Sequence, residues 1–142
     1  MSQKEITNWR DRYFPYNWHR APRLSEDMFL TDIDGIEWRR NKNGFLEPRG
    51  FFEYKMMYIF DEIIEKIEIN NRLHWQLHLL ETIARNFRAQ NIYAWFVGYK
   101  YGEEKNIIEQ VKVFNISLWV KGIKPQVKIL SDWEFAEFLQ RL

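Results

Sequence analysis

Two short stretches decide the fold, TDIDGIEW at positions 31–38 and FFEYK at positions 51–55. Between them lies NKNG at 41–44, a composition typical of a turn. We therefore predict one hairpin, with a first strand over 28–39 and a second over roughly 50–56. Pro48 and Gly50 predict that the second strand starts late or carries a bulge.

The charged side chains of this hairpin are spaced two residues apart. Side chains at i and i+2 of a strand point to the same face, so Glu53 and Lys55 share a face and Tyr54 points to the other. By the same rule Asp32 and Asp34 share a face. Acidic side chains beside a lysine suit a divalent metal ion and a hydrolytic water.

The pattern of Asp34 on one strand and Glu53-Tyr54-Lys55 on the next resembles the PD-(D/E)XK nuclease superfamily. Gln76 adds to the resemblance, because many members carry a glutamine in the helix after the lysine. The resemblance covers roughly positions 28–100 and is closest to small phage and mobile-element members. The chain departs from the family at the front, where members have a glutamate on a first helix. Here the nearby acids, Glu26 and Asp27, fall in a predicted loop.

The resemblance implies an α/β fold with a restriction-endonuclease-like core, a central mixed sheet flanked by helices. It implies a deoxyribonuclease that uses Mg²⁺ or Mn²⁺, held by Asp34, Glu53 and the backbone carbonyl of Tyr54. Lys55 would orient the attacking water and stabilise developing negative charge, and Gln76 would hold the lysine or the water in place. The product would be a phosphodiester cut by hydrolysis, without a covalent intermediate.

Three accessory residues lie before the motif or at its start. Asp32 is a candidate for a second metal or a supporting acid. The pair His19-Arg20 has two readings. In one, Arg20 grips a phosphate and His19 lies near the metal, as a similar pair does in phage members of the family; in the other, both are surface residues around Trp18.

The 142 residues predict a single domain spanning the whole chain, and 46% of them are hydrophobic. Aromatic residues make up 18%, which we interpret as core filling rather than base stacking. The net charge is +1, so attraction to nucleic acid would have to be local, and an acidic stretch over 26–37 is indeed flanked by basic segments. The chain has no cysteine, which excludes disulfides and thiolate zinc sites. With neither a membrane span nor a signal peptide in the sequence, we expect a cytoplasmic protein, in the host cytoplasm if it is viral.

Further elements follow from periodicity. A helical stripe over 57–69 includes Phe60, Ile63 and Ile67 and ends at Asn70-Asn71. The strongest predicted helix covers 72–90, strands are predicted at 92–99, 111–120 and 127–130, and Ser131 opens a last helix with Trp133, Ala136, Phe138 and Leu139 on its apolar side. His74 and His78 have metal-ligand spacing on a helix, but Trp75 stands where zinc hydrolases have glutamate, so we interpret the pair as structural or solvent-facing.

Three alternatives to the nuclease stay open. The first is a relative of the same fold that binds nucleic acid without cutting it. The second is a phage accessory protein that blocks a host defence or joins a replication or recombination complex. The third is a plain α/β domain in which Glu53 and Lys55 form only a cross-strand salt bridge. Within the nuclease interpretation, the absence of a helix-turn-helix or zinc module favours structure-selective or non-specific cutting of DNA. The expected assemblies are a homodimer or a larger replication or recombination complex.

Overall fold

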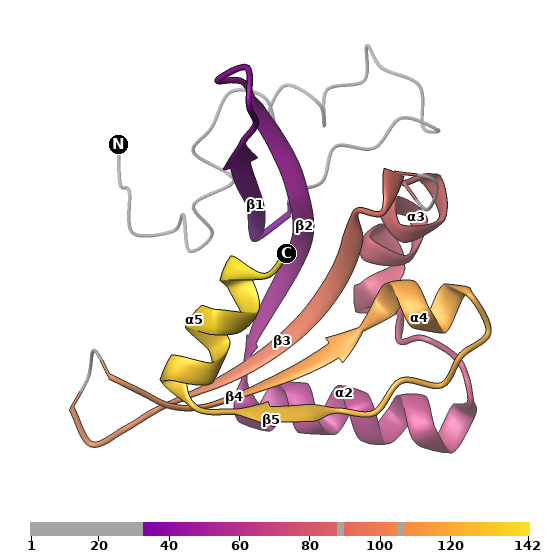
Figure 1. Cartoon of the computed structure of the whole chain (residues 1–142). Coiled ribbons are helices and arrows are strands. Elements are labelled where there is room, and N and C mark those ends of the chain that lie inside the picture. Colours follow the sequence, from indigo (N-terminus) through magenta and orange to yellow (C-terminus); the bar gives the residue numbers. More distant parts are fainter. Residues whose placement is uncertain (1–32, 88–89, 105–106) are drawn as a thin grey trace, which may run out of the picture. The chain divides into compact units, whose positions relative to one another are not determined.

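The hairpin predicted from the sequence leads into a mixed sheet with helices on both faces (Figure 1). The computed structural model of the chain describes residues 33–87, 90–104 and 107–142. Within these residues the sheet has five strands in the order β1-β2-β3-β4-β5. Strands β2 and β3 are parallel, and the other neighbours are antiparallel. The predicted α/β class with a mixed sheet flanked by helices is confirmed at this level.

The elements run along the chain as β1 (Gly35–Arg40), β2 (Leu46–Met56), α2 (Met57–Asn70), the 3₁₀ helix η2 (Trp75–Leu77), α3 (His78–Asn86), β3 (Tyr93–Tyr101), β4 (Ile108–Asn115), α4 (Ile116–Val120), β5 (Lys128–Leu130) and α5 (Asp132–Gln140). Ile33–Leu142 forms one compact unit. That all 142 residues form a single domain stays a prediction. No helix among the described residues is long and apolar enough to cross a bilayer.

The turn of the β1-β2 hairpin is built by Asn41. Its side-chain oxygen accepts hydrogen bonds from the backbone N–H groups of Asn43 and Phe45, at 2.9 and 3.0 Å. Gly44 takes the left-handed conformation that closes the turn, with φ of +84°. Of the two alternatives predicted for the second strand, the bulge is confirmed, because the register changes between Glu37 and Trp38. The late start is wrong, because β2 begins at Leu46. The first strand was predicted from position 28, but its described part begins only at Gly35.

The connection from β2 to β3 is helical, as a parallel pair requires. Helix α2 buries Phe60, Ile63 and Ile67 of the predicted stripe and ends at Asn71, whose φ is +52°. The helix predicted over 72–90 is wrong at its start. His74 has an extended backbone, η2 follows it, and α3 begins only at His78.

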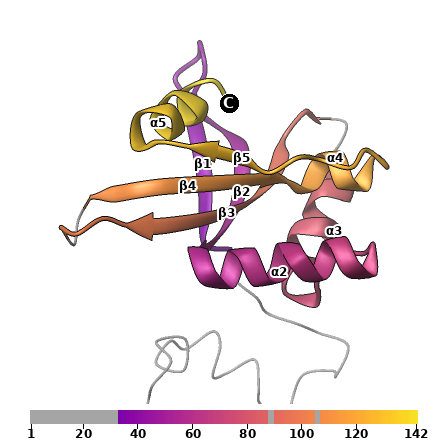
Figure 2. The ribbon, with the colours of Figure 1, turned by 90° about the horizontal axis from the view of Figure 1, so that it is seen from below.

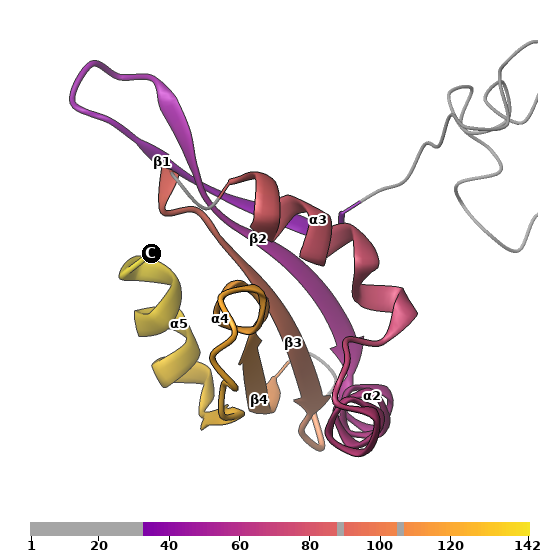
Figure 3. The same cartoon turned by 90° about the vertical axis from the view of Figure 1, so that its right-hand side faces the viewer.

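Helices α2 and α3 cover one face of the sheet and α5 covers the other (Figures 2 and 3). The first face carries a core of buried residues that includes Phe51, Phe60, Phe96 and Leu77. The second face carries a smaller core around Phe52, onto which side chains of α5 pack. The two cores alternate along β2 because neighbouring side chains of a strand point to opposite faces.

Two predictions in the C-terminal half are wrong in detail. The strand predicted over 111–120 ends at Asn115, whose side chain accepts a hydrogen bond from Leu118 N at 3.0 Å and so starts α4. Helix α5 begins at the predicted capping box, in which Ser131 and Glu134 bond reciprocally. Trp133, however, is 81% exposed, and Phe135 packs onto the core in its place.

Candidate active site

Asp34 lies immediately before β1, at the open end of the hairpin. Gly35 pairs with Phe52, so the next position outward brings Asp34 opposite Glu53. Its Oδ2 accepts a hydrogen bond from the backbone N–H of Tyr54 at 2.9 Å. This bond fixes one carboxylate oxygen of Asp34 against β2 while the side chain stays exposed. Two acids far apart in sequence are thereby brought together across the hairpin.

Glu53 and Lys55 lie at the end of β2 on the face that α2 and α3 cover. In the ladder to β3 they pair with Phe96 and Gly98. Lys55 Nζ lies 3.3 Å from Glu53 Oε1, and the two side chains are 29% and 20% exposed. The prediction that they share a face is confirmed. The predicted cross-strand salt bridge is corrected, because this ion pair runs along a single strand.

Tyr54 points to the opposite face, as predicted. Its ring stacks on Phe52 with centroids 5.7 Å apart and lies over Gly35, where a Cβ would come within 3.4 Å of it. Burial, with the negative charges of Glu37 and Asp34 adding to it, raises the pKa of the Tyr54 phenol to about 12. The phenol therefore remains protonated at neutral pH, so what Tyr54 offers the candidate site is its backbone.

Gln76 does not lie on the helix where the sequence placed it. It is exposed on η2, and its backbone N–H donates to Nδ1 of His74 at 3.3 Å. The role predicted for the Gln76 side chain stays a prediction. Asp32, His19 and Arg20 lie outside the described residues.

Three arginines of the hairpin have partners within the protein. Arg39 donates to the carbonyl oxygen of Leu139, Arg40 donates to that of Gly44, and Arg49 pairs with Glu47 at 3.6 Å. The turn lies at the far end of β1 from the candidate site, about 20 Å away over six residues at 3.3 Å each. The backbone of a bound DNA strand would have to run along β1 to reach both the candidate active site and the turn.

The donor set of the candidate site is two carboxylates and one ammonium group. Carboxylate oxygens are the ligands that Mg²⁺ prefers, and one or two of them with water and substrate phosphate are its usual protein site. Asp34 and Glu53 therefore fit the ion in kind and in number. The described residues contain no group of three or more His, Cys, Asp or Glu side chains placed to hold a metal.

A second set of polar side chains gathers away from this site. Lys66, Arg72, His74, Trp75 and His78 line one pocket between α2 and α3. The density of basic and histidine residues around Trp75 is a weak signal for this pocket in the sequence, whereas helical spacing alone predicts that His74 and His78 share a helix face. The two histidines do not share a helix face, because His74 has an extended backbone before η2 and α3 begins only at His78.

No family model, curated protein or solved structure matches this chain. The function proposed below therefore rests on the side chains of the candidate site.

Proposed function

We propose that this chain is a metal-dependent nuclease that hydrolyses phosphodiester bonds in DNA, with a restriction-endonuclease-like core and Mg²⁺ or Mn²⁺ as its cofactor. One observation carries the proposal. Asp34 and Glu53 meet at the open end of the hairpin, and the ammonium group of Lys55 lies 3.3 Å from the Glu53 carboxylate. Two carboxylates beside a lysine suit phosphodiester hydrolysis with a metal ion.

In the proposed reaction a water oxygen forms a bond to phosphorus while a P–O ester bond breaks. A bound ion would supply Lewis-acid stabilisation of the negative charge on the phosphoryl oxygens and would lower the pKa of water. Asp34 and Glu53 would hold the ion, and the Tyr54 N–H keeps the Asp34 carboxylate oriented. Lys55 stabilises the charge that develops on the attacked phosphate, because its Nζ lies at the site, 3.3 Å from Glu53 Oε1.

Two features of the chain bear on which DNA substrate it would cut. The sequence carries no separate recognition module, which favours structure-selective or non-specific cutting over a fixed target sequence. In the described part of the chain β1 is the outer strand of the sheet, so DNA can approach the candidate active site from that edge. This access also favours structure-selective or non-specific cutting. A homodimer or a larger replication or recombination complex would supply further contacts with DNA.

A catalytically silent binding or interaction protein of the same fold is the second candidate. It is favoured by the Glu53–Lys55 ion pair itself, which satisfies both charges without any metal. It is also compatible with a phage accessory or anti-defence role. The two candidates differ in one measurable property, since a metal that binds only the folded state raises the melting temperature.

The decisive experiment incubates the purified chain with linear duplex, single-stranded, flap and four-way-junction DNA in Mg²⁺ and then in Mn²⁺. Glu53→Ala and Lys55→Ala proteins run in parallel. The controls are Glu109→Ala and Lys100→Ala, which remove the members of another ion pair, 3.6 Å apart between β3 and β4 and more exposed than Glu53 and Lys55. The thermal stability of each protein is recorded with EDTA and with Mn²⁺.

Cutting that EDTA, Glu53→Ala and Lys55→Ala abolish, and that the two controls retain, would support the proposal. Removal of a group that acts in the transition state should lower the rate by about 10²–10³-fold. An absence of cutting on every substrate, together with no metal-dependent rise in melting temperature, would refute it. A rise without cutting would favour the silent binding protein.

A further inference from the structure

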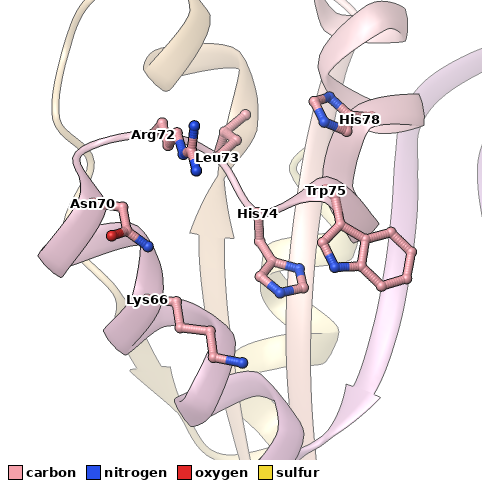
Figure 4. Close-up of a pocket in the computed structure, with 7 residues that line it drawn as sticks. All are labelled: Lys66, Asn70, Arg72, Leu73, His74, Trp75 and His78. Atoms are coloured by element: carbon pink, nitrogen blue, oxygen red, sulfur yellow. The ribbon is translucent and has the colours of Figure 1, made fainter.

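The pocket between α2 and α3 is rich in cationic and aromatic groups. It has a volume of about 420 Å³, within the range of about 300–1,000 Å³ typical of small-molecule sites. Lys66 comes from α2, Arg72 and His74 come from the segment that follows it, Trp75 opens η2, and His78 opens α3. Figure 4 shows the His74 ring between the Lys66 ammonium group and the Trp75 ring.

The lining contains no carboxylate. The nearest acids bond at its margin, where Glu62 lies 3.2 Å from Lys66 and Glu81 lies 3.8 Å from Nδ1 of His78. No ion pair of the described residues includes Arg72. The pocket is therefore a local concentration of positive charge in a chain whose net charge is only +1.

Trp75 supplies an uncovered aromatic surface beside these cations. Its side chain is 68% exposed, although an indole gains most from burial. Its ring lies 5.5 Å from that of His74, tilted by 31°. An exposed indole next to phosphate-binding cations is the combination with which proteins hold single nucleotides, through base stacking and charge.

His74 is oriented to donate into the pocket. Its Nδ1 accepts the N–H of Gln76, so the neutral ring carries its proton on Nε2. Desolvation lowers the pKa of His74 below its usual value of 6.5. The positive charges of Lys66 and His78 lower it further, and the negative charge of Glu62 opposes them. A bound anion acts in the opposite direction, so anion binding and His74 protonation should favour each other.

We propose that this pocket binds one nucleotide unit, with the base stacked on Trp75 and the phosphate held by Lys66, Arg72 and His74. The occupant is a nucleotide, either free or within a single strand, because a base and a phosphate together match the ring and the cations. The proposal goes beyond DNA hydrolysis at the hairpin and does not depend on it, since Asp34, Glu53 and Lys55 do not line the pocket.

The test measures binding in EDTA, where no metal-dependent cutting can occur. Fluorescein-labelled dT10 and the mononucleotide dAMP represent the two sources of the ligand. Trp75→Ala should weaken dT10 binding by about 5- to 150-fold, the loss expected for one stacked base. Trp133→Ala is the control, because Trp133 is also exposed, at 81% against 68% for Trp75, but lies on α5, away from the pocket.

The phosphate contacts are tested by salt dependence. Lys66→Gln and Arg72→Gln should each weaken dT10 binding and reduce the slope of log K against log[salt] by about 0.7. Lys100→Gln is the control, since Lys100 has the same exposed character and its own acidic partner, Glu109. Binding of dT10 should also strengthen as the pH falls from 7 to 5, because His74, whose pKa burial lowers, gains its proton in this range, and His74→Gln should reduce that change.

Loss of dT10 binding in Trp75→Ala but not in Trp133→Ala supports the proposal, and equal effects on dAMP would identify a free nucleotide as a sufficient ligand. Three results would overturn it. These are no binding of either dT10 or dAMP, binding that Trp75→Ala leaves unchanged, and displacement of dT10 by an oligoglutamate peptide at the same concentration as by dAMP. Cutting in Mg²⁺ without pocket binding would leave the nuclease proposal intact.

Discussion

Replacing Gly98 with alanine tests how α2 is seated on the sheet beside the candidate active site. Gly98 lies on β3 between Lys55 of β2 and Lys112 of β4. A Cβ added to it would come within 2.5 Å of Cγ and 2.6 Å of Cβ of Phe60. Phe60 is fully buried and stacks on Phe96 with ring centroids 4.6 Å apart. Since Cβ and Cγ lie close to the backbone of α2, a rotation of the ring cannot relieve the contact.

The cost follows from two opposing terms. Overpacking a core costs about 1–3 kcal/mol, and the position of these atoms favours the upper end of that range. Alanine in a strand recovers about 0.5–1 kcal/mol relative to glycine. Gly98→Ala should therefore destabilise the protein by about 2 kcal/mol, which corresponds to a fall of about 1 M in the urea midpoint for an m value of about 2 kcal/mol/M.

Urea unfolding followed by fluorescence and by circular dichroism measures this cost. The control is Gly102→Ala, where the nearest atom to the new Cβ is Ile107 O at an ordinary 3.5 Å. It should leave stability unchanged within about 0.5 kcal/mol or raise it slightly. In the background of Phe60→Ala the cost of Gly98→Ala should fall but not vanish, because the contact with Cγ is gone while the 2.6 Å contact with the Cβ of residue 60 remains. Equal midpoints for Gly98→Ala and Gly102→Ala would refute the packing argument.

Three further predictions concern single groups. Tyr54 ionises near pH 10 when unfolded but at about 12 when folded, so the stability it contributes is present below pH 10 and is lost between pH 10 and 12. Urea unfolding at several alkaline pH values should show a smaller decline for Tyr54→Phe than for wild type, and equal declines would contradict the assignment. Ser117→Ala should cost about 1–3 kcal/mol in the same unfolding assay at neutral pH, because its buried Oγ accepts the Ala94 N–H at 2.9 Å and that donor would lose its partner. Ser131→Ala should cost about 1 kcal/mol by removing the cap of α5, and a far-UV circular dichroism spectrum of unchanged shape would show that the helix itself persists. A cost below 0.5 kcal/mol for either serine would mean that water replaces the lost bond.

The sequence predicted the features that depend on neighbours along the chain. The alternation of Glu53, Tyr54 and Lys55 fixed their faces, because the strand geometry repeats every two residues. The stripe of Phe60, Ile63 and Ile67 located the buried face of α2 in the same way, from a period of 3.6. The capping box at Ser131 is likewise a contact across three residues, so its pattern was sufficient.

The candidate active site was predictable only in part. Asp34 and Glu53 were recognised from their types and order, and hairpin pairing alone brings them opposite each other. Gln76 was predicted on a helix because the apolar spacing continues through Leu77 and Leu80, both of which are buried. The spacing does not reveal that His74 takes an extended conformation and starts a 3₁₀ turn, which moves Gln76 to an exposed position.

By itself the sequence determined the hairpin, the faces of its charged residues, the stripe of α2 and the start of α5, since local periodicity and short-range hydrogen bonds specify each of them. Only the tertiary structure decided that the chain leaves the strand at Asn115, where the hydroxyl of Ser117 in α4 takes the N–H of Ala94, a residue 23 positions away. It also decided the gathering of Lys66 and Trp75 around one pocket, because the chain turns at Asn71 after α2 and brings η2 and the start of α3 beside the last turns of α2. Such contacts depend on which surfaces meet after packing, and no pattern within a single element encodes that meeting.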